Sequence, residues 1–364
     1  MIQALQNAVD RFFGRGRHST SVPIMDGPLQ PNQRLESAPV LAQAPQIDNA
    51  VTTDDGALLY SSGEQLLQHN GSEGTVLVRF DASITCLATL GAALAVGVNG
   101  QGVAIRGGAH DGYRIATLGN QPLVCPTAAL FADEHTLFIA CGSSRFSAEE
   151  WKHDLMAQGR SGSVWRVDLA SGNAQPLAQG LAFPYGLALS PAGMLLVTEA
   201  WEHRIVEVSP RGGQAPRPVL DELPAYPARL VRASGGGYWL ACFAPRNPLV
   251  EFVLREPGYR DRMVAQIDPR YWIAPTLAAR ASHQVPMQSG GIRQMNILKP
   301  WAPSFSYGLV IRLDAQLLPV ASWQSRADGT VHGITAACEH AGHLIATAKG
   351  PGRLVAIDIS ESAQ

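Results

Sequence analysis

One pattern recurs six times along the 364-residue chain: a turn-rich cluster followed by a short apolar strand. The six strands cover residues 57–60, 92–96, 136–140, 194–198, 238–241 and 343–347. Each is preceded by another short strand, and most are followed by a third with alternating polar and apolar residues. Fourth strands are predicted at residues 76–80, 113–118, 218–220 and 319–323. Four strands repeated six times predict an all-β fold, a six-bladed β-propeller with four-stranded blades.

The last repeat has only three strands before the chain ends. We expect the missing outer strand to come from the N-terminal side, within about residues 21–40, so that the two ends of the domain pair and close the ring. A two-sheet sandwich and a solenoid are the alternatives, but neither explains six units that end one strand short. Residues 21–364 are therefore predicted to form one propeller domain.

Residues 1–20 are predicted to form a separate arm with a short amphipathic helix. Its apolar residues recur at helical spacing, at Ile2, Leu5, Val9 and Phe12. Packing against the body or a partner subunit is the interpretation we favour, and contact with a membrane is the alternative.

Two blades carry insertions, because the spacing between their second strands is too long for a four-stranded unit. One insertion covers about residues 142–162 of blade 3, where Ser147 and Glu150 have the spacing of a capping box and predict a short helix. The other covers about residues 245–306 of blade 5, with helices predicted near residues 249–255 and 259–267. Both follow a second strand, so alternating strand direction places both over the mouth of the central channel.

Composition excludes several partners and suggests a compartment. Lys and Arg number 28 against 30 Asp and Glu, so no excess of positive charge favours nucleic acid or acidic lipid. No segment is apolar enough for stable insertion into a membrane, and no secretory signal is evident. The five cysteines are far apart and flanked by apolar residues, which predicts buried free thiols and a cytoplasmic location.

Several motifs identify a resemblance. The sequence FPYGLALSP at residues 183–191, followed by LVTE at 196–199, resembles a signature of strictosidine synthase-like proteins. Further matches are LPAYP at 223–227, APRNP at 244–248, YGLV at 307–310 and EHAG at 339–342. The similarity spans roughly residues 45–360. It implies a six-bladed propeller related to the gluconolactonase and paraoxonase hydrolases.

The resemblance implies that those relatives hold a divalent metal, often calcium, in the channel, with Glu, Asn and Asp oxygens as its ligands. This chain departs from that ligand set. Asp48 would replace the Glu, Thr127 stands near the second ligand, Tyr185 replaces an Asn, and Ala228 and Arg229 replace an Asp-Asn pair. A guanidinium repels a divalent cation. We therefore predict that the metal site is lost and that no cofactor is present.

The channel mouth is predicted to carry the chemistry. His332 is the candidate general base, Tyr185 a proton donor, Arg229 a clamp for a carboxylate or oxyanion, and Asp48 their carboxylate partner. Candidate substrate-binding residues are Thr127, Glu199, Trp201, Ser144, Thr335 and Tyr307. Thr335 stands where strictosidine synthase would have its catalytic Glu, so the alkaloid-forming reaction is not supported. No lysine falls on an innermost strand, which disfavours Schiff-base chemistry.

The sequence thus predicts a metal-independent enzyme acting on a small organic molecule in the channel. Ester or lactone hydrolysis, lyase chemistry and cyclisation or condensation all suit the predicted residues. A non-catalytic propeller that binds a ligand or a protein is one alternative, and a metal-dependent lactonase with different ligands is another. The sequence does not decide whether the chain forms a homo-oligomer.

Overall fold

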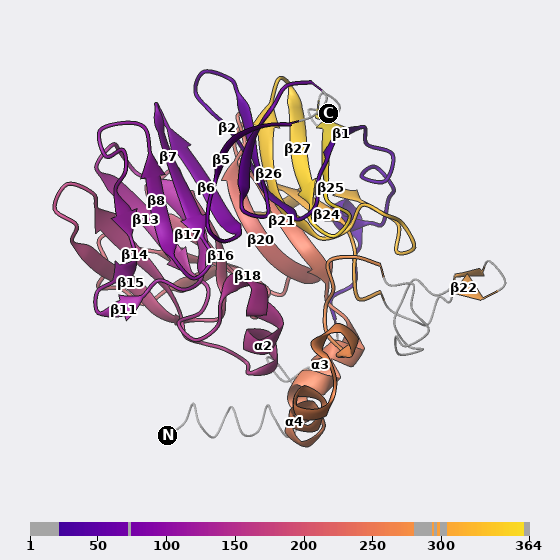
Figure 1. The fold of residues 1–364 in the computed structure, drawn as a ribbon. Helices are drawn as coiled ribbons and strands as arrows, with labels where there is room; N and C mark the ends of the chain where they lie inside the picture. The colour runs from indigo at the N-terminus through magenta and orange to yellow at the C-terminus, as the bar shows by residue number, and fades with distance from the viewer. Residues whose placement is uncertain (1–21, 72–73, 280–292, 295–296, 299–303, 360–364) are drawn as a thin grey trace.

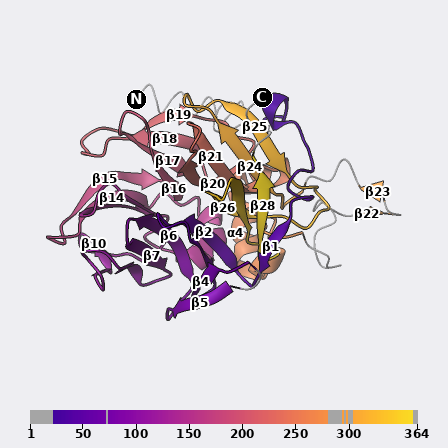
Figure 2. The same cartoon turned by 90° about the horizontal axis from the view of Figure 1, so that it is seen from above.

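The computed structural model describes residues 22–71, 74–279, 293–294, 297–298 and 304–359. In this part of the chain, six antiparallel sheets of four strands each stand around a common axis, the channel (Figures 1 and 2). The innermost strand of each sheet contacts that of the next sheet, and the sixth contacts the first. The predicted six-bladed propeller is therefore confirmed. Residues 1–20, predicted to form the arm, lie outside the described residues.

Each blade runs outward from its innermost strand. Blade 1 is β2 (Ile47–Thr52), β3 (Leu58–Ser62), β4 (Gln65–His69) and β5 (Gly74–Arg79), and blade 2 is β6 (Ile84–Leu90), β7 (Ala93–Val98), β8 (Gly102–Arg106) and β9 (Arg114–Ile115). Blade 3 is β12 (Pro126–Phe131), β13 (Thr136–Cys141), β14 (Gly162–Asp168) and β15 (Ala174–Leu181), and blade 4 is β16 (Pro184–Leu189), β17 (Leu195–Glu199), β18 (Arg204–Val208) and β19 (Arg217–Leu220). Blade 5 is β20 (Ala225–Arg232), β21 (Tyr238–Pro245), β24 (Leu309–Leu313) and β25 (Pro319–Gln324), and blade 6 is β26 (Ile334–His340), β27 (His343–Ala348), β28 (Arg353–Asp358) and β1 (Val40–Gln43). Two-stranded hairpins join β10 (Thr117–Leu118) to β11 (Gln121–Pro122) and β22 (Arg293–Gln294) to β23 (Ile297–Leu298).

The ring closes through an N-terminal strand, but at a later position than the sequence suggested. Strand β1 covers Val40–Gln43 and pairs with β28, so it overlaps the predicted window of residues 21–40 only at Val40. The earlier part of that window contacts blade 5 instead. The short helix η2 (Gly27–Leu29) packs on β25, and the Leu35 N–H donates to the Gln324 carbonyl, also in blade 5.

The core is divided into layers between adjacent blades. Strand β17 is buried along its whole length, because both faces of its blade pack against neighbours. Separate apolar clusters join blades 3 and 4, blades 4 and 5, and blades 6 and 1.

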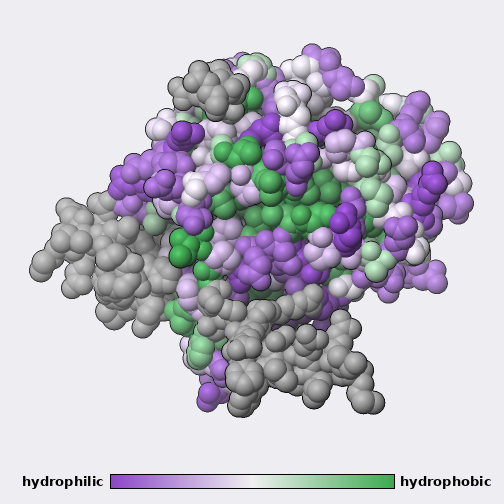
Figure 3. Space-filling view, turned by 180° about the vertical axis from the view of Figure 1, so that it is seen from behind, coloured by the Kyte–Doolittle hydropathy of each residue, from purple (hydrophilic) through white to green (hydrophobic). Residues whose placement is uncertain are grey.

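Apolar surface also gathers in the middle of the face shown in Figure 3, with polar residues around it. All five cysteines are buried and free, as predicted.

A short helix occupies the predicted insertion in blade 3. Ser147 and Glu150 form the predicted capping box, in which the Glu150 carboxylate accepts from the Ser147 N–H at 3.0 Å. The short helix η3 (Ala148–Glu150) leads directly into α2 (Trp151–Met156). The helix predicted for this insertion is therefore confirmed.

Two longer helices occupy the insertion in blade 5. Helix α3 (Pro248–Arg255) begins where the Asn247 side chain accepts from the Leu249 N–H at 2.8 Å. Helix α4 (Pro257–Gln266) and the short helix η4 (Pro269–Tyr271) follow it. The helices predicted near residues 249–255 and 259–267 are both present, with starts one and two residues earlier.

Helices α2, α3 and α4 lie together on one face of the ring (Figure 1). This is the face that the alternating strand directions predicted for both insertions. In the described residues, no helix is long and apolar enough to cross a membrane.

Candidate functional site

The innermost strand of every blade has an irregular register near its start. The shifts fall between Ile47 and Ala50, Ile84 and Cys86, Pro126 and Ala128, Pro184 and Gly186, Pro227 and Leu230, and Ile334 and Ala336. A bulge of this kind re-aims a side chain next to a site. Five of the bulged residues line one pocket at the channel mouth: Asp48, Thr85, Thr127, Tyr185 and Arg229.

Threonine hydroxyls hold these bulges in place between blades. Thr127 Oγ1 donates to the Pro184 carbonyl at 2.6 Å, which joins blade 3 to blade 4. Thr335 Oγ1 donates to the Asp48 carbonyl at 2.8 Å, which joins blade 6 to blade 1. The backbone around the pocket is therefore fixed by contacts across blade boundaries.

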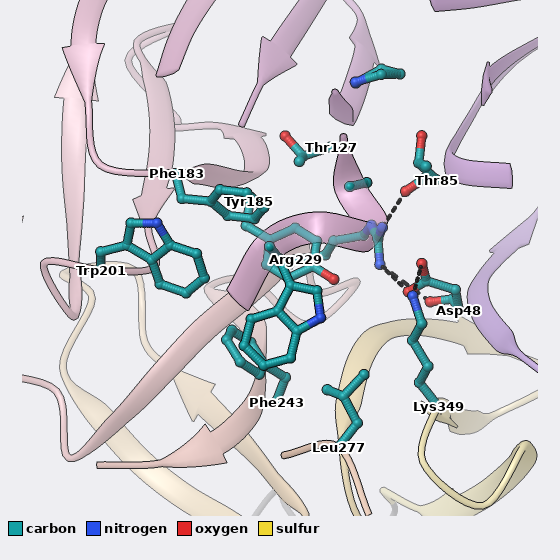
Figure 4. A pocket seen from close by; sticks show the side chains of 13 residues that line it. Asp48, Thr85, Thr127, Phe183, Tyr185, Trp201, Arg229, Phe243, Leu277 and Lys349 are labelled. Carbon is teal, nitrogen blue, oxygen red and sulfur yellow. Dashed lines mark hydrogen bonds and ion pairs between the residues drawn. The ribbon is translucent and has the colours of Figure 1, made fainter. Parts of the chain in front are cut away.

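The Arg229 guanidinium reaches across the channel to three other blades. Its Nη1 donates to Asp48 Oδ1 at 3.1 Å, to the Asp48 carbonyl at 3.2 Å and to the Thr335 carbonyl at 3.1 Å. Its Nη2 donates to the Thr85 carbonyl. Lys349, just after β27, donates from Nζ to Asp48 Oδ2 at 2.9 Å (Figure 4). One carboxylate is thus shared by two cations.

These charges fix the protonation states of the site. Burial raises the pKa of Asp48, but the charges of Lys349 and Arg229 outweigh it and hold the pKa at about 2. Burial lowers the pKa of Lys349, and the Asp48 carboxylate reverses that effect and raises it. Burial, with a smaller contribution from Asp48, raises the pKa of Tyr185. At neutral pH the site therefore holds one anion, two cations and a protonated phenol.

Aromatic rings form the rest of the pocket wall. They are Trp151, Phe183, Tyr185, Trp201 and Phe243. Phe183 and Trp201 stack with their centroids 4.5 Å apart, and the Arg229 guanidinium lies over the Tyr185 ring at 5.0 Å. In Figure 4 the rings of Phe183 and Trp201 lie on one side and Asp48 and Lys349 on the other. The pocket has an apolar half and a charged half.

Both insertions cover this pocket. Ala148 and Trp151 come from the first insertion and Leu277 from the second. Helix α2 is tied to the wall, because Trp201 Nε1 donates to Asp154 Oδ2 at 2.8 Å. The free volume of the cavity is about 20 Å³, which is room for about one water molecule. A larger ligand requires these covering side chains to move outward.

Of the ten site residues proposed from the sequence, five line the pocket and five do not. The five in the pocket are Asp48, Thr127, Tyr185, Trp201 and Arg229. The five outside it are His332, Glu199, Ser144, Thr335 and Tyr307.

His332, the candidate base, has both ring nitrogens engaged. Nε2 lies 2.7 Å from the Arg326 carbonyl, so it carries the proton, and Nδ1 accepts from Ser306 Oγ at 2.8 Å. Burial lowers the pKa of His332. The imidazole therefore joins the Ser306 hydroxyl to the Arg326 carbonyl, and it is not among the residues that line the pocket.

The other four outlying residues also have structural partners. Glu199 accepts from the Ala182 N–H and pairs with Arg204. Tyr307 donates to Gln324, and the exposed Ser144 donates its N–H to Ser161 Oγ. The Thr335 carbonyl accepts from Arg229, and the Thr335 hydroxyl donates to the Asp48 carbonyl.

Sequence reasoning missed Lys349 and Thr85. Lys349 is indeed not on an innermost strand, but it follows the second strand of blade 6, and its long side chain reaches Asp48 from there. Thr85 has the same place in blade 2 that Thr127 has in blade 3. Aligning the six innermost strands on their bulges would have found it.

The residues present do not fit the channel metal that the resemblance implies. The carbonyl oxygens of Asp48, Thr85 and Thr335 accept from the Arg229 guanidinium, so the oxygens that a cation would need are occupied. Lys349 adds a second positive charge. Among the described residues, no group of three or more His, Cys, Asp or Glu side chains could hold a metal ion.

Comparison with known proteins agrees with the motifs. No protein-family model matches the chain. The strictosidine synthase-like 10 protein of Arabidopsis thaliana is 28% identical over 130 residues, which cover 35% of this chain and 35% of that protein. An adipocyte plasma membrane-associated protein of Salmo salar is 23% identical over 365 residues, covering 93% of this chain and 82% of the relative. Over part of its length the chain is thus similar to the strictosidine synthase-like proteins. The plant match spans about a third of that relative.

Solved structures share the fold. A gluconolactonase from Xanthomonas campestris has a TM-score of 0.56 at 15% identity, over 92% of this chain and 96% of that chain. A luciferin-regenerating enzyme has a TM-score of 0.51 at 10% identity, over 89% of this chain and 93% of that chain. At such identities the likeness shows the propeller fold.

Proposed function

We propose that this propeller is an enzyme that hydrolyses an ester or lactone of a small organic molecule, without a metal, in the channel-mouth pocket. The observation that carries the proposal is the convergence of Arg229, Lys349 and Tyr185, three hydrogen-bond donors, beside an aromatic wall. The fold shared with a gluconolactonase supports the same class of substrate. Lyase or cyclisation chemistry would use the same donors.

The donors suit a reaction in which negative charge develops on oxygen. Water adds to the carbonyl carbon, and the Lys349 ammonium stabilises the resulting oxyanion. Tyr185 is protonated and donates to the leaving oxygen as the carbon–oxygen bond breaks, and the proton released by water restores the phenol. Asp48, with its pKa at about 2, orients the two cations and is a poor proton acceptor.

Tyr185→Phe tests this assignment. We expect kcat for the best lactone or ester found by screening to fall about 100-fold, because the proton donor is lost while the ring stays. Tyr307→Phe is the matched control, since its hydroxyl donates to Gln324 outside the pocket, and it should leave kcat unchanged. Equal kcat in wild type and Tyr185→Phe would contradict the assignment.

A ligand-binding propeller without catalysis is the second candidate. It is favoured by the engagement of Asp48 with both cations, which leaves the pocket short of a general base. Saturable binding without turnover of any lactone or ester would favour this candidate. The predicted cytoplasmic location also stays a proposal, and the five free cysteines are consistent with it.

A further inference from the structure

We propose that the pocket selects an organic anion, a carboxylate carried on a flat apolar body. This inference deepens the proposed function, because it names the substrate class of the same site. It rests on the charge of the pocket, on an unpaired donor and on the shape of the apolar wall.

The charges that line the pocket do not balance. Asp48 contributes one negative charge, and Arg229 and Lys349 contribute two positive charges. No other lining residue is charged at neutral pH, because the rest are Tyr185 and uncharged side chains. One bound carboxylate would neutralise the site, and its attraction is strong because the groups are largely buried.

The two cations also retain donors for a ligand. Arg229 Nε is buried and has no hydrogen-bond partner among the described residues. A buried donor without an acceptor is costly, so an acceptor from a ligand is expected there. Lys349 Nζ has three N–H donors, and the bond to Asp48 Oδ2 uses one of them. Arg229 and Lys349 thus line the same pocket, and each has an N–H donor that these contacts do not use.

The apolar half of the pocket suits a planar group once the covering side chains have moved outward. Phe183 and Trp201 are stacked, and Phe243 lies edge-on to Tyr185. Aromatic rings favour offset or edge contacts with another flat ring. A cationic amine is disfavoured, because Asp48 already accepts from both Arg229 and Lys349.

Three matched probes test the inference on the full-length chain: 3-phenylpropanoate, 3-phenylpropanamide and 3-phenylpropylamine. We expect calorimetry to show that the acid binds at least about tenfold tighter than the amide and that the amine does not bind. Lys349→Met should remove about tenfold of the affinity for the acid and less of the affinity for the amide, so that the preference for the acid shrinks. Arg217→Met, which removes an exposed cation of β19 outside the pocket lining, should change neither.

Equal affinity for acid and amide, preference for the amine, or no binding of any probe would overturn the inference. An unchanged preference for the acid in Lys349→Met would overturn it too. Turnover of neutral lactones with no preference for the acid would keep the proposed function and reject only this inference. Binding of the acid without turnover of any ester or lactone would keep this inference and reject the proposed function.

Discussion

Replacing Arg229 with methionine is expected to lower the free energy of unfolding by about 3 kcal/mol and to abolish activity in the pocket. The substitution keeps an unbranched side chain but removes the charge that binds three other blades. The carbonyls of Asp48, Thr85 and Thr335 lose their donor, and Asp48 keeps Lys349 as its remaining cation. The pKa of Asp48 should rise, because one of the two charges that lower it is gone.

Urea unfolding at pH 7 measures this effect, with Arg217→Met as the control. Arg217 pairs with Glu207 on the surface, and its side chain is 68% exposed, so its loss should cost about 1 kcal/mol or less. A cost for Arg229→Met no larger than that of the control would show that the guanidinium does not hold the blades together.

Ala42→Asp in the ring-closing strand β1 is expected to lower the free energy of unfolding by about 3 kcal/mol. Ala42 is 6% exposed and packs in the apolar cluster between blades 6 and 1, so a carboxylate there would be buried without a partner. Val40→Asp is the control, because Val40 lies in the same strand but is 48% exposed. Equal unfolding midpoints for the two variants in urea would contradict the role of β1 in closing the ring.

The fold could be predicted because its unit repeats. Six similar strand patterns give the blade count, and the missing strand in the last unit gives the closure. The position of β1 was harder to predict, because a four-residue strand has a weak pattern. Residues 27–35 look equally suitable, but η2, Asn32 and Leu35 contact β25 of blade 5.

The candidate site was predictable only in part. Asp48, Tyr185 and Arg229 sit at bulges of innermost strands, and strand order alone places them at the mouth. His332 lies close to the start of β26 in sequence, but its side chain turns away to Ser306 and Arg326. Lys349 reaches the pocket only because its side chain is long, which the strand pattern does not reveal.

The Arg229 guanidinium binds the carbonyl oxygens of Asp48, Thr85 and Thr335, so these oxygens are not free for a divalent cation, and the proposed metal-independent chemistry depends on this arrangement. Elemental analysis of the purified, dialysed protein for calcium, magnesium, manganese and zinc, paired with thermal unfolding before and after chelation, tests it most directly. We predict well below one metal ion per chain and an unchanged Tm. One divalent ion per chain, with a Tm that falls when the ion is removed, would contradict it.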